Sequence, residues 1–159
     1  MLSYKLLFFL PLISTIFTYP FGVLLGEKTA QYFSSTLISI AAILSWFLFI
    51  SFSSSSSSEI IIPVLEWFFV SGQFFNWGIS VNSLTLLMLT LVLTVSALVH
   101  IYSIEYMSHD NSKVRFMTYL SLFTFCMVAL VVSDNLIQLF FGWEGVGLAS
   151  YLLIGFWLS

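Results

Sequence analysis

Charged residues are scarce in this chain. Only 7% of its 159 residues are Asp, Glu, Lys or Arg, whereas a soluble domain carries about 25%. Because 60% of the residues are hydrophobic, the chain has too few charges to keep a globular fold soluble in water. Its 4 basic residues are scattered and its net charge is −3, so it offers no basic patch for a nucleic acid. These shortages predict an integral membrane protein.

Cysteine is almost absent as well. The one cysteine, Cys126, lies inside an apolar run; this excludes a disulfide framework and a zinc knuckle, and it indicates a small core residue. The sequence also lacks a Gly-x-Ser-x-Gly elbow, a phosphate-binding glycine loop and a CxxC pair. It therefore gives no support to soluble hydrolase, nucleotide or thiol chemistry.

The long apolar runs that are present predict an all-α membrane protein. A transmembrane barrel would show short segments of alternating polarity, whereas these runs are continuous and close to the roughly 20 residues that a helix needs to cross a bilayer. About five transmembrane helices are expected, at residues 2–25, 32–52, 81–104, 116–132 and 136–157. They divide the chain into residues 1–52 with two helices, residues 53–78 with a loop, and residues 79–159 with three helices.

The loop at residues 53–78 has two unlike halves. It begins with six consecutive serines, at positions 53–58, which are typical of a flexible linker. Its aromatic second half predicts a partly ordered interfacial loop or hairpin, with Trp67 and Trp77 as anchors at the membrane interface.

The few basic residues predict an orientation. Lys28 falls in the first loop, and Lys113 and Arg115 fall in the third, so with five helices these loops lie on one side of the membrane. The positive-inside rule assigns that side to the matrix or cytoplasm. The C-terminus is then expected on the inner side. The N-terminus and the serine-rich loop are expected on the outer side, which in a mitochondrion is the intermembrane space.

One carboxylate lies where membrane proteins rarely place a charge. Glu144 is near the middle of the last apolar run, and a carboxylate at the bilayer centre costs about 2.5–3.5 kcal/mol on insertion scales. Gly145 and Ala149 have the spacing of close helix packing, so Glu144 is expected to face the interior of a bundle. It either takes up and releases protons or forms a static ion pair. Its partner is expected from another chain, because no other charge in this sequence obviously lies at the same depth.

Further residues are candidates for a proton relay or for its support. Tyr151 shares a helical face with Glu144 at a step of seven and is placed to share a hydrogen bond or a water with it. His100, near the inner end of the third helix, is interpreted as an interfacial proton relay or as helix-end polarity. A metal site is disfavoured, because Glu105 and His109 follow His100 without an HExxH spacing.

Two charged residues have simpler interpretations. Asp134 begins the fifth expected helix, where an acid caps free N–H groups and is favoured by the helix dipole. Arg115 lies with Lys113 in the third loop, just before the fourth expected helix, and both are interpreted as determinants of topology.

Three segments carry a resemblance to a known family. Residues 100–107 read HIYSIEYM, residues 115–127 read RFMTYLSLFTFCM, and residues 134–157 read DNLIQLFFGWEGVGLASYLLIGFW. Together they closely resemble subunit 5 of NADH dehydrogenase (ubiquinone), the distal antiporter-like membrane subunit of respiratory complex I. Residues 77–92, WGISVNSLTLLMLTLV, resemble the same family more weakly, and before residue 77 the likeness is mainly one of hydropathy.

The resemblance implies a proton-translocating role within NADH:ubiquinone reductase of the mitochondrial inner membrane. Glu144 matches the family's fifth-helix glutamate, which pairs with a lysine of the seventh helix; His100, Asp134 and Arg115 fall on family-like positions. NADH, FMN, iron–sulfur clusters and ubiquinone belong to other subunits, so this chain is expected to hold no redox cofactor and no metal. Its expected partners are membrane lipid and other membrane-arm subunits, including the adjacent subunit 4.

The sequence also departs from the family. Family members have well over a dozen helices, whereas this sequence shows about five and lacks the seventh-helix lysine. We therefore expect the N-terminal fragment of a split subunit 5, with a second chain carrying the remainder. Two alternatives stay open: a structural or assembly fragment of the membrane arm without pumping, and a subunit of a related multi-subunit cation/proton antiporter.

Overall fold

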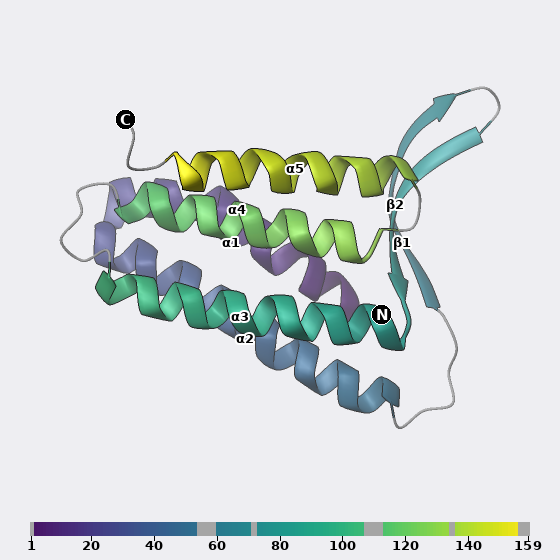
Figure 1. Cartoon of the computed structure of the whole chain (residues 1–159), viewed down its shortest axis with the longest axis horizontal. Helices are drawn as coiled ribbons and strands as arrows, with labels where there is room; N and C mark the ends of the chain where they lie inside the picture. The colour runs from purple at the N-terminus through teal and green to yellow at the C-terminus, as the bar shows by residue number, and fades with distance from the viewer. Residues whose placement is uncertain (1, 54–59, 71–72, 107–112, 134–135, 156–159) are drawn as a thin grey trace.

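The computed structural model describes residues 2–53, 60–70, 73–106, 113–133 and 136–155 (Figure 1). These residues form helices α1 Leu2–Leu25, α2 Glu27–Ser53, α3 Ser83–Tyr106, α4 Lys113–Val131 and α5 Leu136–Ile154, and strands β1 Ile60–Val70 and β2 Gln73–Val81. All five helices are long and apolar enough to cross a membrane. The prediction of a helical membrane bundle with five spans is confirmed.

The first connection is shorter than the sequence suggests. Only Gly26 separates α1 from α2, and its φ of 106° lies in the left-handed region that a side chain would strain. The N–H of Ala30 donates to the carbonyl of Gly26 at 3.2 Å, and Glu27 in the first turn is favoured by the helix dipole. For these reasons α2 begins five residues before the expected start at residue 32.

The helices pack as antiparallel neighbours, and α5 lies at the edge. α1 contacts α2 and α4, α2 also contacts α3, and α5 packs mainly against α4. Figure 1 shows α5 along the outer side of the bundle. Over its most apolar stretch only 17% of α5 is buried, against 28% or more for each other helix. One side of α5 is therefore left uncovered by the described residues.

The aromatic segment forms an antiparallel hairpin, which was one of the two predicted alternatives. Its register runs from Ile60 opposite Val81 to Val70 opposite Gln73. The N–H of Ser80 donates to the carbonyl of Val132 at 2.9 Å, so the base of the hairpin is tied to the end of α4.

Not every prediction for this loop falls within the description. Trp67 and Trp77 lie in the strands, but their side chains are outside the described part, as is most of the serine tract. The junction between this segment and α3 lies within the described residues. The amide N–H of Thr85 donates to the Asn82 side-chain oxygen at 2.9 Å, so Asn82 caps the start of α3.

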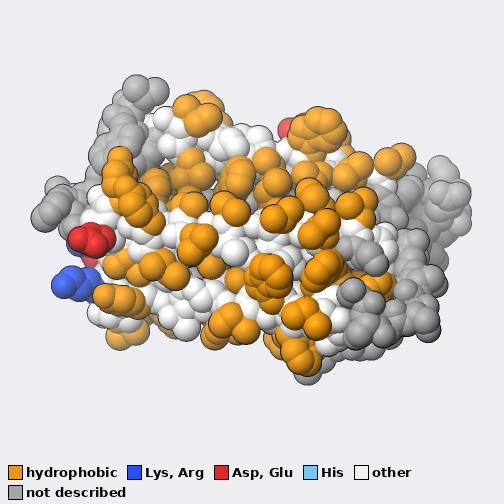
Figure 2. Space-filling model, turned by 60° about the horizontal axis from the view of Figure 1, so that its bottom comes forward, with side chains coloured by type: hydrophobic (Ala, Val, Ile, Leu, Met, Phe, Trp, Pro, Cys, Tyr) orange, Lys and Arg blue, Asp and Glu red, His pale blue; other side chains and the backbone are white. Residues whose placement is uncertain are grey.

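Charged side chains gather at one end of the bundle. Lys113 Nζ lies 3.1 Å from a carboxylate oxygen of Glu27, which brings the first and third connections to the same end, as predicted. Figure 2 shows apolar side chains along the length of the visible face, with blue and red side chains mostly at that end. The side of the membrane on which this end lies stays a prediction.

Breaking this ion pair is expected to change stability little. The Lys113 side chain is 14% exposed and that of Glu27 is 47% exposed, and an ion pair whose carboxylate is open to water contributes about 1 kcal/mol or less. Lys113→Met should therefore shift thermal unfolding in detergent by a few degrees or less, with a still smaller shift in high salt. A large shift that persists in high salt would contradict this.

Candidate functional site

Small residues on α5 fix how closely it approaches α4. A Cβ added at Gly142 would lie 2.7 Å from the backbone N of Leu130, and one added at Gly145 would lie 2.5 Å from Cys126 Sγ. Ala149 is fully buried on the same side. The predicted close packing through Gly145 and Ala149 is confirmed, as is the role of Cys126 as a small buried residue.

Glu144 points away from the bundle, which corrects the expectation that it faces the interior. Successive helical residues are rotated by about 100°, so Glu144 lies about 200° from Gly142, on the side of α5 opposite α4. Its side chain is exposed, among the exposed apolar side chains of Phe140, Trp143 and Leu148. The small residues that pack α5 against α4 are the physical reason for this placement.

Glu144 is also isolated in depth. It is the ninth of the 19 residues of α5. Every other Asp, Glu, Lys or Arg of the described helices lies in the first or last few residues of its helix. No described residue forms an ion pair or hydrogen bond with the Glu144 side chain. The carboxylate therefore stands at mid-span on an outward, apolar face.

Tyr151 lies on that same face and is 73% exposed. Seven residues correspond to about 10.5 Å of helix rise, which is too far for a direct hydrogen bond to Glu144. Gly147 lies between them, and an added Cβ there would meet nothing within 4 Å. This outward face therefore combines a carboxylate, a phenol and a glycine notch.

A second polar group lies inside the bundle, around His100. The His100 side chain is fully buried, and its Nε2 lies 3.3 Å from the hydroxyl of Ser121 on α4. That hydroxyl lies 2.7 Å from the hydroxyl of Ser14 on α1. One imidazole and two hydroxyls thus join three helices.

The other ring nitrogen fixes the tautomer of His100. Nδ1 lies 2.7 Å from the backbone carbonyl of Ser96. A carbonyl oxygen only accepts hydrogen bonds, so Nδ1 carries the hydrogen and donates it. In the neutral ring Nε2 is then the acceptor, and Ser121 donates to it.

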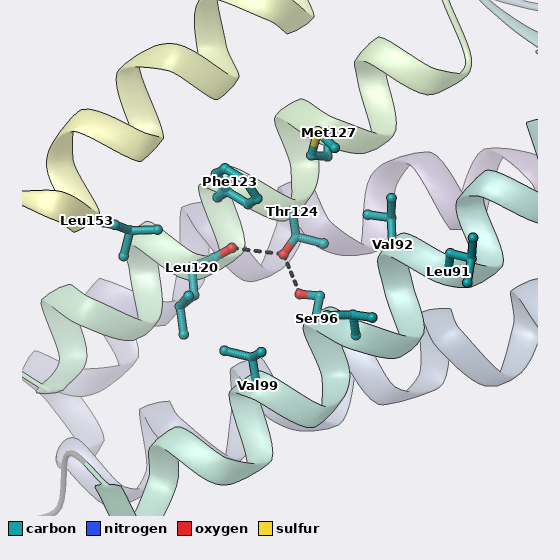
Figure 3. Close-up of a pocket in the computed structure, with 10 residues that line it drawn as sticks. Leu91, Val92, Ser96, Val99, Leu120, Phe123, Thr124, Met127 and Leu153 are labelled. Carbon is teal, nitrogen blue, oxygen red and sulfur yellow. Dashed lines mark hydrogen bonds between the residues drawn. The ribbon is translucent and has the colours of Figure 1, made fainter.

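A branch of the network reaches a groove on the surface. The Ser96 hydroxyl bonds the Thr124 hydroxyl at 2.5 Å, and Thr124 donates to the Leu120 carbonyl at 2.9 Å. Both hydroxyls line an apolar groove of about 400 Å³ between α3 and α4, which Leu153 of α5 borders (Figure 3).

The remaining predicted site residues do not join these groups. Arg115 lies in the third position of α4, at the charged end of the bundle, and is half-buried. Asp134 and His109 fall outside the described residues. In the described part, no group of three or more His, Cys, Asp and Glu side chains is placed to hold a metal ion.

Sequence reasoning missed the hydroxyls around His100. Ser14, Ser121 and Thr124 lie in apolar helices, and each is less than 3% exposed. The available signal was their spacing, since Ser96 precedes His100 by four residues and Ser121 precedes Thr124 by three. Such steps place polar groups on one face of a helix.

Comparison with known proteins finds similarity to chain 5 and subunit L of NADH dehydrogenases. Residues 67–117 match the family described as NADH-ubiquinone oxidoreductase (complex I), chain 5 N-terminus. The chain is 45% identical over 158 residues to NADH-ubiquinone oxidoreductase chain 5 of Arabidopsis thaliana, covering 98% of this chain and 23% of the relative. It is 48% identical over 141 residues to NADH-quinone oxidoreductase subunit L of Rhodobacter capsulatus, covering 84% of this chain and 19% of the relative.

These matches confirm the family resemblance drawn from the motifs. The chain spans 23% and 19% of the length of these two curated relatives, and the likeness to the first extends over almost all of its own length. It therefore includes the region before residue 77, where the sequence motifs alone showed only hydropathy.

Proposed function

Because the chain matches the N-terminal region of the complex I chain 5 and subunit L family, we propose that it is a membrane component of complex I that takes part in proton translocation. Glu144 is the group that exchanges the proton. The observation that carries the proposal is the placement of this carboxylate at mid-span, on an outward and otherwise apolar face of α5.

The exposed carboxylate requires a neighbour outside this sequence. Leaving it against lipid costs about 2.5–3.5 kcal/mol, and no described residue pairs with it. Gly147, one turn away, leaves open space, and a glycine at a helix surface lets another helix approach closely. We infer that a helix bearing a cation covers this face, in agreement with the lysine that the family resemblance implies.

The proposal assigns the remaining parts to other chains. Electron transfer and its cofactors are held by other subunits, and the end of the bundle with Lys113 and Glu27 faces the matrix. We propose a mitochondrial location, which the similarity to NADH-ubiquinone oxidoreductase chain 5 of Arabidopsis thaliana supports. The basic residues at that end, Lys28 and Arg115 among them, support the orientation through the positive-inside rule.

Neutralising Glu144 tests the function. In purified complex reconstituted into liposomes, Glu144→Gln should lower the number of protons moved per electron, while NADH oxidation and assembly are largely retained. Gln keeps the shape of the side chain and removes the titratable proton. Glu105→Gln is the matched control, since Glu105 is an exposed carboxylate at the end of α3.

Other outcomes separate the alternatives. An unchanged proton-to-electron ratio in Glu144→Gln would overturn the role of this carboxylate. Lost assembly, with the few remaining complexes pumping normally, would favour a structural fragment of the membrane arm. Sodium-dependent transport, with antiporter subunits as co-purifying partners, would favour the multi-subunit antiporter.

The split-subunit hypothesis makes a separate prediction. In native gels of solubilised membranes, this chain should migrate with complex I subunits and with a second chain that carries the later helices of subunit 5, at about one-to-one. Mass spectrometry across the lanes measures this. Migration of the chain alone would contradict membership of complex I.

A further inference from the structure

The network around His100 is separate from Glu144 and joins different helices. Glu144 lies on the outward side of α5, whereas the imidazole is enclosed by α1, α3 and α4. Every polar partner found for His100 is a hydroxyl or a backbone carbonyl, so none of these partners is charged. The network is therefore a titratable group in a neutral, buried setting, which static helix packing does not require.

We propose that His100 is a second proton-loading site, reached through the hydroxyls of Ser121 and Ser14. This inference rests on the proposed role of the chain in proton translocation and adds a buried site to it. Because Nδ1–H is held by the Ser96 carbonyl at 2.7 Å, Nε2 is the nitrogen that gains and loses the proton.

The proton movements balance along the chain of hydroxyls. Ser121 passes its hydroxyl proton to Nε2 across 3.3 Å and takes the hydroxyl proton of Ser14 across 2.7 Å. Ser14 is then refilled by a proton that a water on the α1–α2 side relays from the aqueous phase, so that the water itself is left unchanged. The result is an imidazolium and two neutral hydroxyls, and reversal of the same moves unloads the site.

Polar groups of α1 and α2 lie between the Gly26 turn and Ser14, on the side from which water would enter. The hydroxyl of Ser14 lies 3.5 Å from the hydroxyl of Thr18. Thr18 is eight residues before Gly26. Ser35 lies nine residues after Gly26, so at 1.5 Å of rise per residue Thr18 is about 12 Å and Ser35 about 13.5 Å from the turn. Within the described residues, the Oγ of Ser35 and the Nε2 of Gln31 are buried and lack a hydrogen-bond partner.

These two unpartnered atoms indicate a hydrated position. Gln31 and Ser35 are one helical turn apart on α2, and they are 1% and 5% exposed. Buried polar atoms are nearly always bonded to protein or to ordered water, and a buried water needs two to four such partners. Counted from the turn at Gly26, Gln31 lies between the charged end of the bundle and the depth of Thr18, and Ser35 lies at about the depth of Thr18.

The test compares two hydroxyls of α4 that belong to the same network. Ser121→Ala cuts the link to Nε2, whereas Thr124→Val removes a hydroxyl that bonds Ser96 but not the imidazole. Both positions are buried, at 0% and 2% exposed. In reconstituted complex, Ser121→Ala should lower the protons moved per electron about as much as Glu144→Gln does. Thr124→Val should leave the ratio unchanged, and Ser121→Thr should restore it.

The other outcomes either overturn the proposal or separate it from the proposed role of Glu144. A normal ratio in Ser121→Ala, or equal losses in Ser121→Ala and Thr124→Val, would make the network a structural clamp. If Ser121→Ala does not assemble, Ser14→Ala tests the next link, and failure of both to assemble would again mean a clamp. A fall in Ser121→Ala with no effect of Glu144→Gln would support His100 while overturning the role of Glu144.

Discussion

Gly142→Ala is expected to push α5 away from α4 and to lower the amount of assembled protein. The added Cβ would lie 2.7 Å from the backbone N and 2.8 Å from the Cα of Leu130. Backbone atoms cannot rotate aside as a flexible side chain does, so the two helices must separate. Overpacking of this kind costs about 1–3 kcal/mol for a small group, and Gly142→Leu should cost more.

Gly147→Ala is the matched control for this prediction. It makes the same change five residues later in the same helix, where the new Cβ would meet nothing within 4 Å. Alanine also favours the helix over glycine by up to about 1 kcal/mol. Thermal unfolding of the chain in detergent measures both variants. The yield of native complex is a further readout for Gly142→Ala alone, because the helix inferred to cover Glu144 would meet a methyl group added at Gly147. Equal losses in the two variants would show that the contact between α4 and α5 is not the cause.

Gly145 offers an internal check on the same interface. There the added Cβ would meet the side chain of Cys126, at 2.5 Å from Sγ and 3.2 Å from Cβ. Cys126→Gly should therefore relieve part of the loss caused by Gly145→Ala, because the obstructing atoms are removed. No substitution of Leu130 should relieve Gly142→Ala, since its backbone is the obstacle.

The helices were predictable because hydropathy and length determine them. A run of apolar residues has to form a helix to satisfy its backbone in lipid, and α1 begins and ends as expected. The start of α2 was misjudged, because the expected loop is reduced to the single left-handed Gly26. A glycine preceding Glu27 signals such a turn only once the two helices are known to be antiparallel neighbours.

The direction of Glu144 was predicted wrongly for a different reason. Gly145 and Ala149 correctly indicated close packing, but the packed face belongs to them and to Gly142. A residue one position before Gly145 is rotated by about 100° from it. Counting the same rotation over the two residues from Gly142 gives about 200°, which would have placed Glu144 on the outward side. The cost of a buried charge suggested an interior position, whereas the described residues leave the Glu144 side of α5 uncovered.

The network around His100 depends on helix order, which no single helix reveals. Ser14 and Ser121 are 107 residues apart, and only the pairing of α1 with α4 brings them together. The spacing of the polar residues within each helix indicates which face of that helix is polar. The contacts between helices had to come from the structure.

Reversing the charge at Glu144 is expected to have the largest effect of all. If a cation on a helix outside this sequence lies against this face, Glu144→Lys places two cations together in an apolar setting. Leaving a buried charge uncompensated costs about 3–5 kcal/mol. Glu144→Lys should therefore prevent assembly, whereas Glu144→Gln should assemble and fail in pumping.

Second-site suppression identifies the partner directly. Selection for respiratory growth in a Glu144→Lys background should recover substitutions of an acidic residue for a lysine or arginine in one later transmembrane helix. The charge-swapped pair restores attraction at the same depth, so assembly should return even if pumping does not. Normal assembly and pumping in Glu144→Lys alone would mean that no cation faces this carboxylate. Glu144 would then exchange protons with water or with another acid, and the cation-bearing helix inferred above would be wrong.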